Sequence, residues 1–161
     1  RTLQKGMLAL SSNARGYLHR TCKPASGLFM ASASRSFVLP VKPLSPNIGA
    51  VVDADVRQVL QAGAGAVDAL HAALVDREVL IFPEQSLTPH EHMCLGEALG
   101  EIEPPHPVYP NVDGITVLKM EPGGKPDTNE WHSDETFKPH PPFASILHAQ
   151  YVPECGGDTL W

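Results

Sequence analysis

Proline is concentrated in the last third of the chain and limits what that part can fold into. Ten of the 16 prolines lie between Pro104 and Pro153. Proline lacks the backbone donor that a central strand needs and it interrupts helices, so only short strands between turns fit here. Such a pattern favours an antiparallel jelly roll, or double-stranded β-helix. Strands are expected at 115–120, around residue 132, at 143–150 and at 158–161.

Two strands and a helix are expected before the proline-rich part. Apolar runs at residues 48–52 and 79–82 indicate buried strands, and Pro83 closes the second one. Residues 66–76 place apolar side chains on one helical face.

A second helix has clear signals at both of its ends. Thr88 can cap it, Pro89 suits its first turn, Glu91 completes a capping box and Gly100 is a stop signal. The domain is therefore expected to be mainly β, with helices that flank the sheet.

The first 52 residues differ from the rest in charge. They contain seven basic residues and no acidic one, whereas residues 53–161 carry all 18 acidic groups and the remaining five basic ones. A Ser- and Arg-rich, acid-poor stretch is typical of an organelle transit peptide. We expect a leader and a Pro-punctuated linker over residues 1–43 and a domain over residues 44–161.

The start of the translated protein stays open in this interpretation. The chain begins with Arg1, and a true start at Met7 or Met30 would make the residues upstream an untranslated leader. A mitochondrial location is expected if residues 7–36 are a transit peptide, and a cytoplasmic one otherwise.

Composition argues against several classes of protein. The three cysteines form no Cys-x-x-Cys pair, which disfavours a disulfide framework and a structural zinc site. The basic residues are interleaved with apolar ones, and no apolar run is long enough for a membrane span, so neither nucleic acid nor membrane is expected as a partner. Whether the protein forms a homo-oligomer is left open by the sequence.

His132 and Asp134 lie two residues apart, in Trp-His-Ser-Asp. On extended backbone their side chains point to the same side and can bind one face of a metal ion. Imidazole and carboxylate hold Fe(II) with open positions in a 2-His-1-carboxylate triad. Taken alone the pair is weak, because a lone His is more often a packing or surface residue. A zinc hydrolase is a second reading, but zinc recruits a compact His or Cys set that is not visible here.

The surroundings of this pair resemble a known family. Residues 131–137, the Pro-Pro at 141–142 and Gly-Gly-Asp-Thr-Leu-Trp at 156–161 are similar to the pattern of the taurine dioxygenase family (TauD/TfdA), most of all to its taurine-acting members. The likeness covers residues 44–161 and about the first half of such an enzyme, so the jelly roll would be truncated. Further upstream, residues 48–50, 79–83, 99–101 and 106–110 follow in the same order.

The resemblance implies an Fe(II) enzyme with 2-oxoglutarate and dioxygen as cosubstrates. His132 and Asp134 would be iron ligands, and Thr159 would donate a hydrogen bond to a carboxylate of 2-oxoglutarate. His106 and Tyr109 would hydrogen-bond a small anionic substrate. Without the resemblance, Thr159 reads as an ordinary strand residue, and His106 and Tyr109 as parts of a Pro-rich turn.

The substrate implied by the resemblance is taurine or a related sulfonate, from which sulfite would be released. Thr128 and Glu135 depart from the pattern of the taurine enzyme, so another sulfonate, an alkyl sulfate or a carboxylate stays open. The distal His and the Arg residues of the family are expected beyond Trp161. A different class also stays open: a catalytically silent fragment or a jelly-roll binding module that lacks the distal His.

Overall fold

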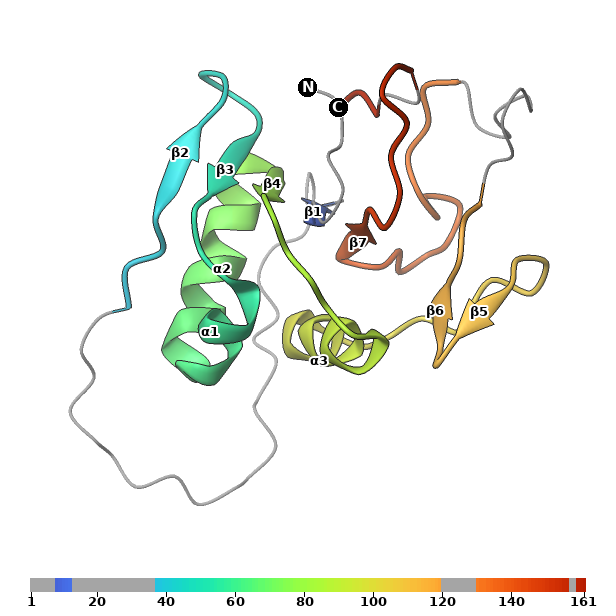
Figure 1. Cartoon of the computed structure of the whole chain (residues 1–161), viewed down its shortest axis with the longest axis horizontal. Helices are drawn as coiled ribbons and strands as arrows, with labels where there is room; N and C mark the ends of the chain where they lie inside the picture. The colour runs from blue at the N-terminus through green and yellow to red at the C-terminus, as the bar shows by residue number, and fades with distance from the viewer. Residues whose placement is uncertain (1–7, 13–36, 120–129, 157–158) are drawn as a thin grey trace.

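A computed structural model describes residues 8–12, 37–119, 130–156 and 159–161 of the chain. Within them, three helices accompany a five-stranded sheet and a separate two-stranded hairpin (Figure 1). The elements are β1 (Leu8–Ser12), β2 (Val41–Pro43), β3 (Ala50–Val52), α1 (Val56–Gln61), α2 (Ala64–Arg77), β4 (Val79–Phe82), α3 (Pro89–Leu99), β5 (Asn111–Val112), β6 (Ile115–Thr116) and β7 (Ala144–His148).

The large sheet is mixed, with the strand order β2-β3-β4-β1-β7. Only β3 and β4 run parallel, as expected for two strands joined by a helical crossover, here α1 and α2. The pairs β2–β3, β4–β1 and β1–β7 are antiparallel. The described residues are therefore a mixed α/β arrangement, whereas a mainly β one was expected. The double-stranded β-helix stays a prediction.

Strand β1 lies inside the stretch that the sequence analysis interprets as leader and linker. Leu8, Ala9 and Leu10 are all fully or almost fully buried. In the register, Leu10 is opposite Leu80 of β4 on one side and Ile146 of β7 on the other. A segment with leader-like composition thus forms an inner strand, which its sequence did not indicate. Whether residues 7–36 include a transit peptide stays a prediction, because 13–36 lie outside the described residues.

Local signals predicted both long helices. Helix α2 covers the expected residues 66–76 and buries Leu70 and Leu74, whose spacing of four places them on one face. Helix α3 has the expected capping box: the Thr88 hydroxyl accepts the Glu91 N–H at 3.2 Å, and the Glu91 carboxylate accepts the Thr88 N–H at 2.8 Å. The short helix α1, capped by Asp55, was not expected.

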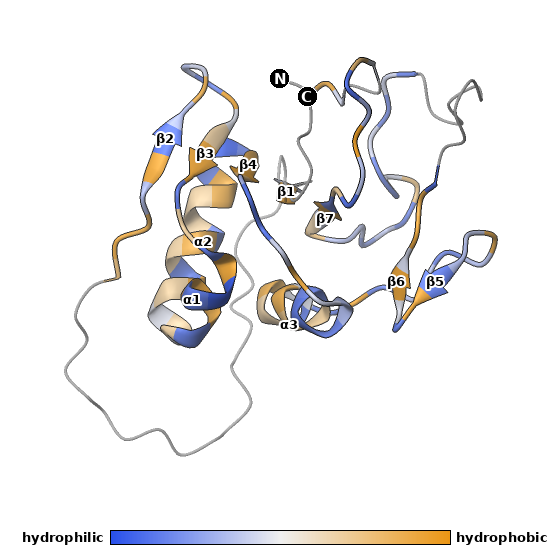
Figure 2. Cartoon of the chain, in the orientation of Figure 1, coloured by the Kyte–Doolittle hydropathy of each residue, from blue (hydrophilic) through white to orange (hydrophobic). Residues whose placement is uncertain are grey.

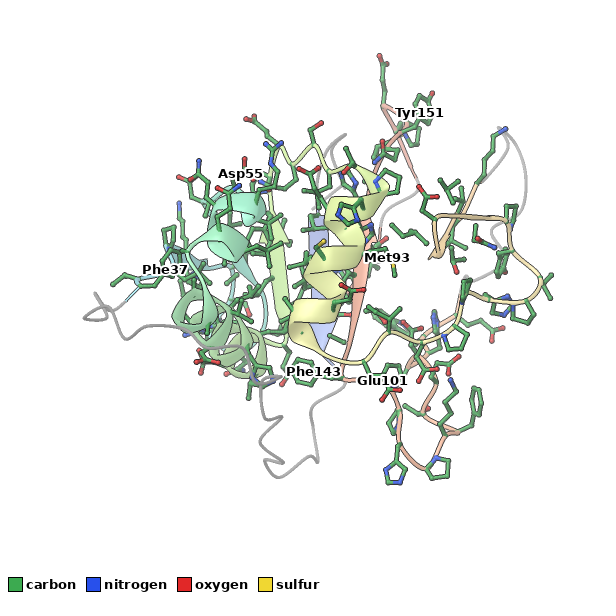
Figure 3. All side chains as sticks on the ribbon, turned by 90° about the horizontal axis from the view of Figure 1, so that it is seen from below. Phe37, Asp55, Met93, Glu101, Phe143 and Tyr151 are labelled. Carbon is green, nitrogen blue, oxygen red and sulfur yellow. The ribbon has the colours of Figure 1, made fainter. Side chains whose placement is uncertain are left out.

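The helices and the strands share one core. Helix α2 packs against β4 and β1 and contacts α1 and α3. In Figure 3, helix α3 lies in front of β1 and β7 and runs roughly along them. At Gly96 a Cβ would come within 2.5 Å of the Ile102 side chain, so this position is a close approach. Figure 2 shows the apolar residues gathered in the strands and along the helices. No helix among the described residues is long and apolar enough to cross a membrane.

Gln85 is a buried polar residue beside this core. Its side-chain oxygen accepts the Val56 N–H at 3.0 Å, and its nitrogen donates to the carbonyls of Ala54 and Pro83. These bonds fasten the start of α1 to the chain that follows β4.

Several expected strands in the proline-rich part are absent or shorter. The strand expected at 115–120 is formed only at Ile115–Thr116, and the one expected at 143–150 is Ala144–His148. The stretch around residue 132 is not a strand but leads into a turn, in which Glu135 has φ +56°. Residues 159–161 are not in a strand either, and 158 lies outside the described residues.

The aromatic side chains beside this turn give the physical reason for the missing strand. Trp131 and Phe137 are 79% and 83% exposed. A strand is stabilised by burying one face, and these two side chains bury little surface against the described residues.

We expect Leu10→Ala to lower the free energy of unfolding by about 2–5 kcal/mol, because Leu10 is fully buried between two strands. The matched control is Leu118→Ala at a side chain that is 63% exposed, which should change stability by less than about 0.5 kcal/mol. Chemical denaturation of both variants measures the difference. Equal effects would mean that β1 is not part of the core.

Candidate metal site

The candidate site is the loop of residues 130–137 where it passes β7. This loop carries His132 and Asp134, and β7 contributes Ser145, whose hydroxyl donates to Asp134 Oδ2 at 2.9 Å. Side chains on β7 alternate between two faces. Ala144 and Ile146 pack against the core, so Ser145 is on the opposite face, toward the loop.

A backbone contact fixes the imidazole of His132. Its Nδ1 is 2.8 Å from the carbonyl oxygen of Glu130. A carbonyl can only accept, so Nδ1 carries the hydrogen, and in the neutral ring the lone pair is on Nε2. That Nε2 lies 3.5 Å from Asp134 Oδ1. The sequence analysis expects both side chains on one side of extended backbone, whereas the structure brings them together through a loop and a turn.

Two acceptor atoms that face each other can share a cation or a hydrogen-bond donor such as water. The Nε2 lone pair of His132 and the carboxylate oxygen of Asp134 form such a pair, and their side chains are 55% and 49% exposed, so ions and water can reach them. Imidazole and carboxylate on one side of an ion fit two positions of a facial triad. Within the described ranges, no group of three or more His, Cys, Asp and Glu side chains is placed to hold a metal.

Lys138 ties the turn after Asp134 to the chain that follows α3. Its ammonium forms ion pairs with Glu135 and, at 2.9 Å, with Glu103. The carboxylates of Glu135 and Glu103 raise the pKa of Lys138 above its ordinary value. Glu135, a residue that departs from the taurine enzyme pattern, thus has a structural contact in this protein.

His106 and Tyr109, the two residues expected to bind the substrate, lie close together. Their ring centroids are 4.7 Å apart and the rings are tilted by 46°. The Nδ1 of His106 accepts the Val108 N–H at 3.2 Å, which leaves Nε2 as the donor of the neutral ring. The His106 N–H also donates to the hydroxyl of Thr116 in β6, so the small hairpin supports this segment.

The role expected for Thr159 has no structural test. Thr159 is partly buried, and its neighbours Gly157 and Asp158 lie outside the described residues. Thr128 also lies outside them. The roles of His132, Asp134, His106 and Tyr109 as ligands likewise stay predictions.

The sequence analysis missed the residues that support the expected ligands. Ser145 is the polar residue between two core-facing positions of an expected strand. This pattern places its side chain on the opposite face but does not indicate its partner. The contacts of Lys138 and the Glu130 carbonyl have no local sequence pattern, since they depend on how the loop folds.

Comparison with known proteins identifies relatives for most of the chain. A family model described as "Taurine catabolism dioxygenase TauD, TfdA family" matches residues 40–161. The alpha-ketoglutarate-dependent sulfate ester dioxygenase of Pseudomonas putida is 36% identical over 138 residues, which are 84% of this chain and 45% of the relative. The alkylsulfatase of Acinetobacter baylyi is 33% identical over 127 residues, 76% of this chain and 39% of the relative.

A third relative is named for a carboxylate substrate. The (S)-phenoxypropionate/alpha-ketoglutarate-dioxygenase of Sphingobium herbicidovorans is 29% identical over 132 residues, 74% of this chain and 43% of the relative. The chain thus spans less than half the length of these three relatives. No solved structure matches it.

Proposed function

The chain belongs to the TauD, TfdA dioxygenase family, and we propose that the protein it is part of is an Fe(II)- and 2-oxoglutarate-dependent dioxygenase for a small anionic substrate. The observation that carries the proposal is the facing pair of His132 Nε2 and Asp134 Oδ1, 3.5 Å apart within the family-matched region. These are the two donor types that the family's chemistry requires on one side of an iron.

The residues of this chain would have three separate tasks. His132 and Asp134 would hold the iron, while the Thr159 hydroxyl would donate to a carboxylate oxygen of 2-oxoglutarate. When bound, Fe(II) supplies the reaction of dioxygen with 2-oxoglutarate that yields succinate and CO₂ and places the second oxygen atom in a substrate C–H bond. His106 and Tyr109 would bind the substrate anion through the Nε2–H and the phenol O–H.

We propose a sulfate ester rather than taurine as the substrate. Two of the relatives are named for sulfate esters or alkyl sulfates, and those named above do not include a taurine enzyme. Hydroxylation of the carbon next to the ester oxygen gives an unstable product that breaks its C–O bond, leaving an aldehyde and inorganic sulfate. A sulfonate hydroxylated beside sulfur would release sulfite instead, so the sulfur product identifies the substrate class.

The test is a panel assay on the protein made from its complete coding sequence. Succinate and the sulfur product are measured with a medium-chain alkyl sulfate, taurine and a phenoxypropionate, each with and without Fe(II). We expect succinate and sulfate in equal amounts with the alkyl sulfate. Sulfite from taurine would correct the substrate class. Absence of substrate-dependent succinate with every compound would contradict the proposal and favour the silent fragment or binding module.

We expect His132→Ala and Asp134→Ala to abolish Fe(II) binding and, with it, all succinate formation, because every later step requires the ligated metal. Anaerobic calorimetric titration with Fe(II) measures the first effect. His140→Ala removes an exposed histidine from the neighbouring loop and should leave binding unchanged. Thr159→Ala is expected to keep iron bound while weakening 2-oxoglutarate. Retained iron affinity in both ligand variants would refute the assignment of this pair.

We expect His106→Ala and Tyr109→Phe to raise KM for the substrate about ten- to a hundredfold, the worth of a charge-assisted hydrogen bond of about 1.5–3 kcal/mol. The affinity for 2-oxoglutarate should change little, because these side chains would contact only the substrate anion. Steady-state kinetics in substrate and in 2-oxoglutarate separate the two. Val108→Ala, at a side chain that is 80% exposed between them, is the matched control. Unchanged KM in both variants would reduce the segment to a structural turn.

A further inference from the structure

The two carboxylate oxygens of Asp134 are in different environments. Oδ2 accepts a hydrogen bond from the Ser145 hydroxyl at 2.9 Å, whereas Oδ1 faces the Nε2 of His132 at 3.5 Å. A carboxylate on an exposed turn is free to rotate and to present either oxygen. The bond from Ser145 removes that freedom and selects Oδ1 as the oxygen beside the imidazole.

Ser145 lies in a paired strand of the sheet, whereas Asp134, which it contacts, does not. Ser145 is the second residue of β7, which pairs along its length with β1, and in the register Ser11 is directly opposite. The residues on both sides of Ser145 pack against the hydrophobic core. Asp134, by contrast, lies in a turn and its side chain is 49% exposed. The hydrogen bond thus transfers the rigidity of the sheet to the loop.

His132 has support of the same kind from a different source. Its imidazole is oriented by a backbone carbonyl, that of Glu130. Outer partners that fix the orientation of a ligand commonly raise metal affinity tenfold to a hundredfold. Of the two supports, only the one on Asp134 comes from a side chain, so a substitution can remove it while the ligand stays in place.

We propose that Ser145 is the positioning residue of the metal site. It holds Oδ2 so that Asp134 offers one oxygen, Oδ1, to an ion shared with His132. This role rests on the proposed function. One-oxygen binding matters there because a carboxylate that used both oxygens would fill a position that the cosubstrates need.

The experiment compares Ser145→Ala with two other variants, Ser145→Thr and Ser11→Ala, in the protein made from its complete coding sequence. Anaerobic calorimetric titration with Fe(II) alone gives the affinity, and the thermal melting of the metal-free proteins gives the structural effect. Ser145→Ala should weaken Fe(II) binding tenfold to a hundredfold. Ser145→Thr keeps the hydroxyl and should bind within a few-fold of the wild type.

Ser11→Ala is the matched control. It removes the same hydroxyl from the residue directly opposite in the same sheet, but the bond to Asp134 comes from Ser145. A general weakening of the β1–β7 pairing would affect Ser11→Ala and Ser145→Ala alike, whereas a positioning role lowers Fe(II) affinity only in Ser145→Ala. If Ser145→Ala melts too early to be titrated, the Fe(II) affinity of Ser145→Thr decides. An affinity like that of the wild type supports the positioning role, and a loss of affinity overturns it.

This design distinguishes failure of the positioning role from failure of the proposed function. Equal Fe(II) affinity of the wild type and Ser145→Ala overturns the positioning role and leaves the proposed function intact. Absence of Fe(II) binding in the wild type overturns the proposed function itself, and the positioning role with it.

Discussion

The pairing of β1 with β4 on one side and with β7 on the other connects the two parts of the molecule. Strands β2, β3 and β4 belong to the helical part, whereas β7 is next to the loop that carries the candidate ligands. Since β1 lies between β4 and β7, the position of Ser145 relative to the core depends on a strand from the other end of the sequence. The hydrogen bond from His148 to the carbonyl of Gln85 is a smaller link between the same parts.

The loop that carries the candidate ligands is held by contacts of three kinds. A backbone carbonyl orients His132, a hydroxyl from β7 orients Asp134, and the ion pairs of Lys138 fix the turn that follows. Each contact acts on a different atom, so none replaces another. Exposed ion pairs contribute little to stability, and the contribution of Lys138 is therefore to geometry rather than to the free energy of unfolding.

The elements that could be predicted from the sequence are those whose signals are local. Thr88 and Glu91 form the expected capping box because both partners lie within one helical turn. The burial of Leu70 and Leu74 follows from their spacing in the same way. Strand β1 could not be predicted, because its burial depends on partners far along the chain and its composition resembles that of a leader.

The proximity of His132 and Asp134 could be predicted from the sequence, but the backbone that produces it could not. The spacing of His132 and Asp134 indicated two donors on one side, and the structure brings their atoms together through a loop and a turn. Ser145 was not predicted, because a serine in a strand has no sequence pattern that identifies its partner. Family membership added the cosubstrates, which no arrangement of the described residues would have indicated by itself.

The place of β1 in the sheet also has a consequence for how the chain folds during synthesis. Leu10 leaves the ribosome about 70 residues before its partner Leu80 and about 136 residues before its partner Ile146. Helices α2 and α3 form from neighbouring residues and can be complete before Ile146 has been made. The apolar side chains of β1 stay in water until these partners have been made. Pairing across so long a stretch is slow, because the loop-closure entropy is lost before any contact forms. A nascent chain of this kind exposes the apolar side chains of β1 until the strands that pair with it, β4 and β7, have been made.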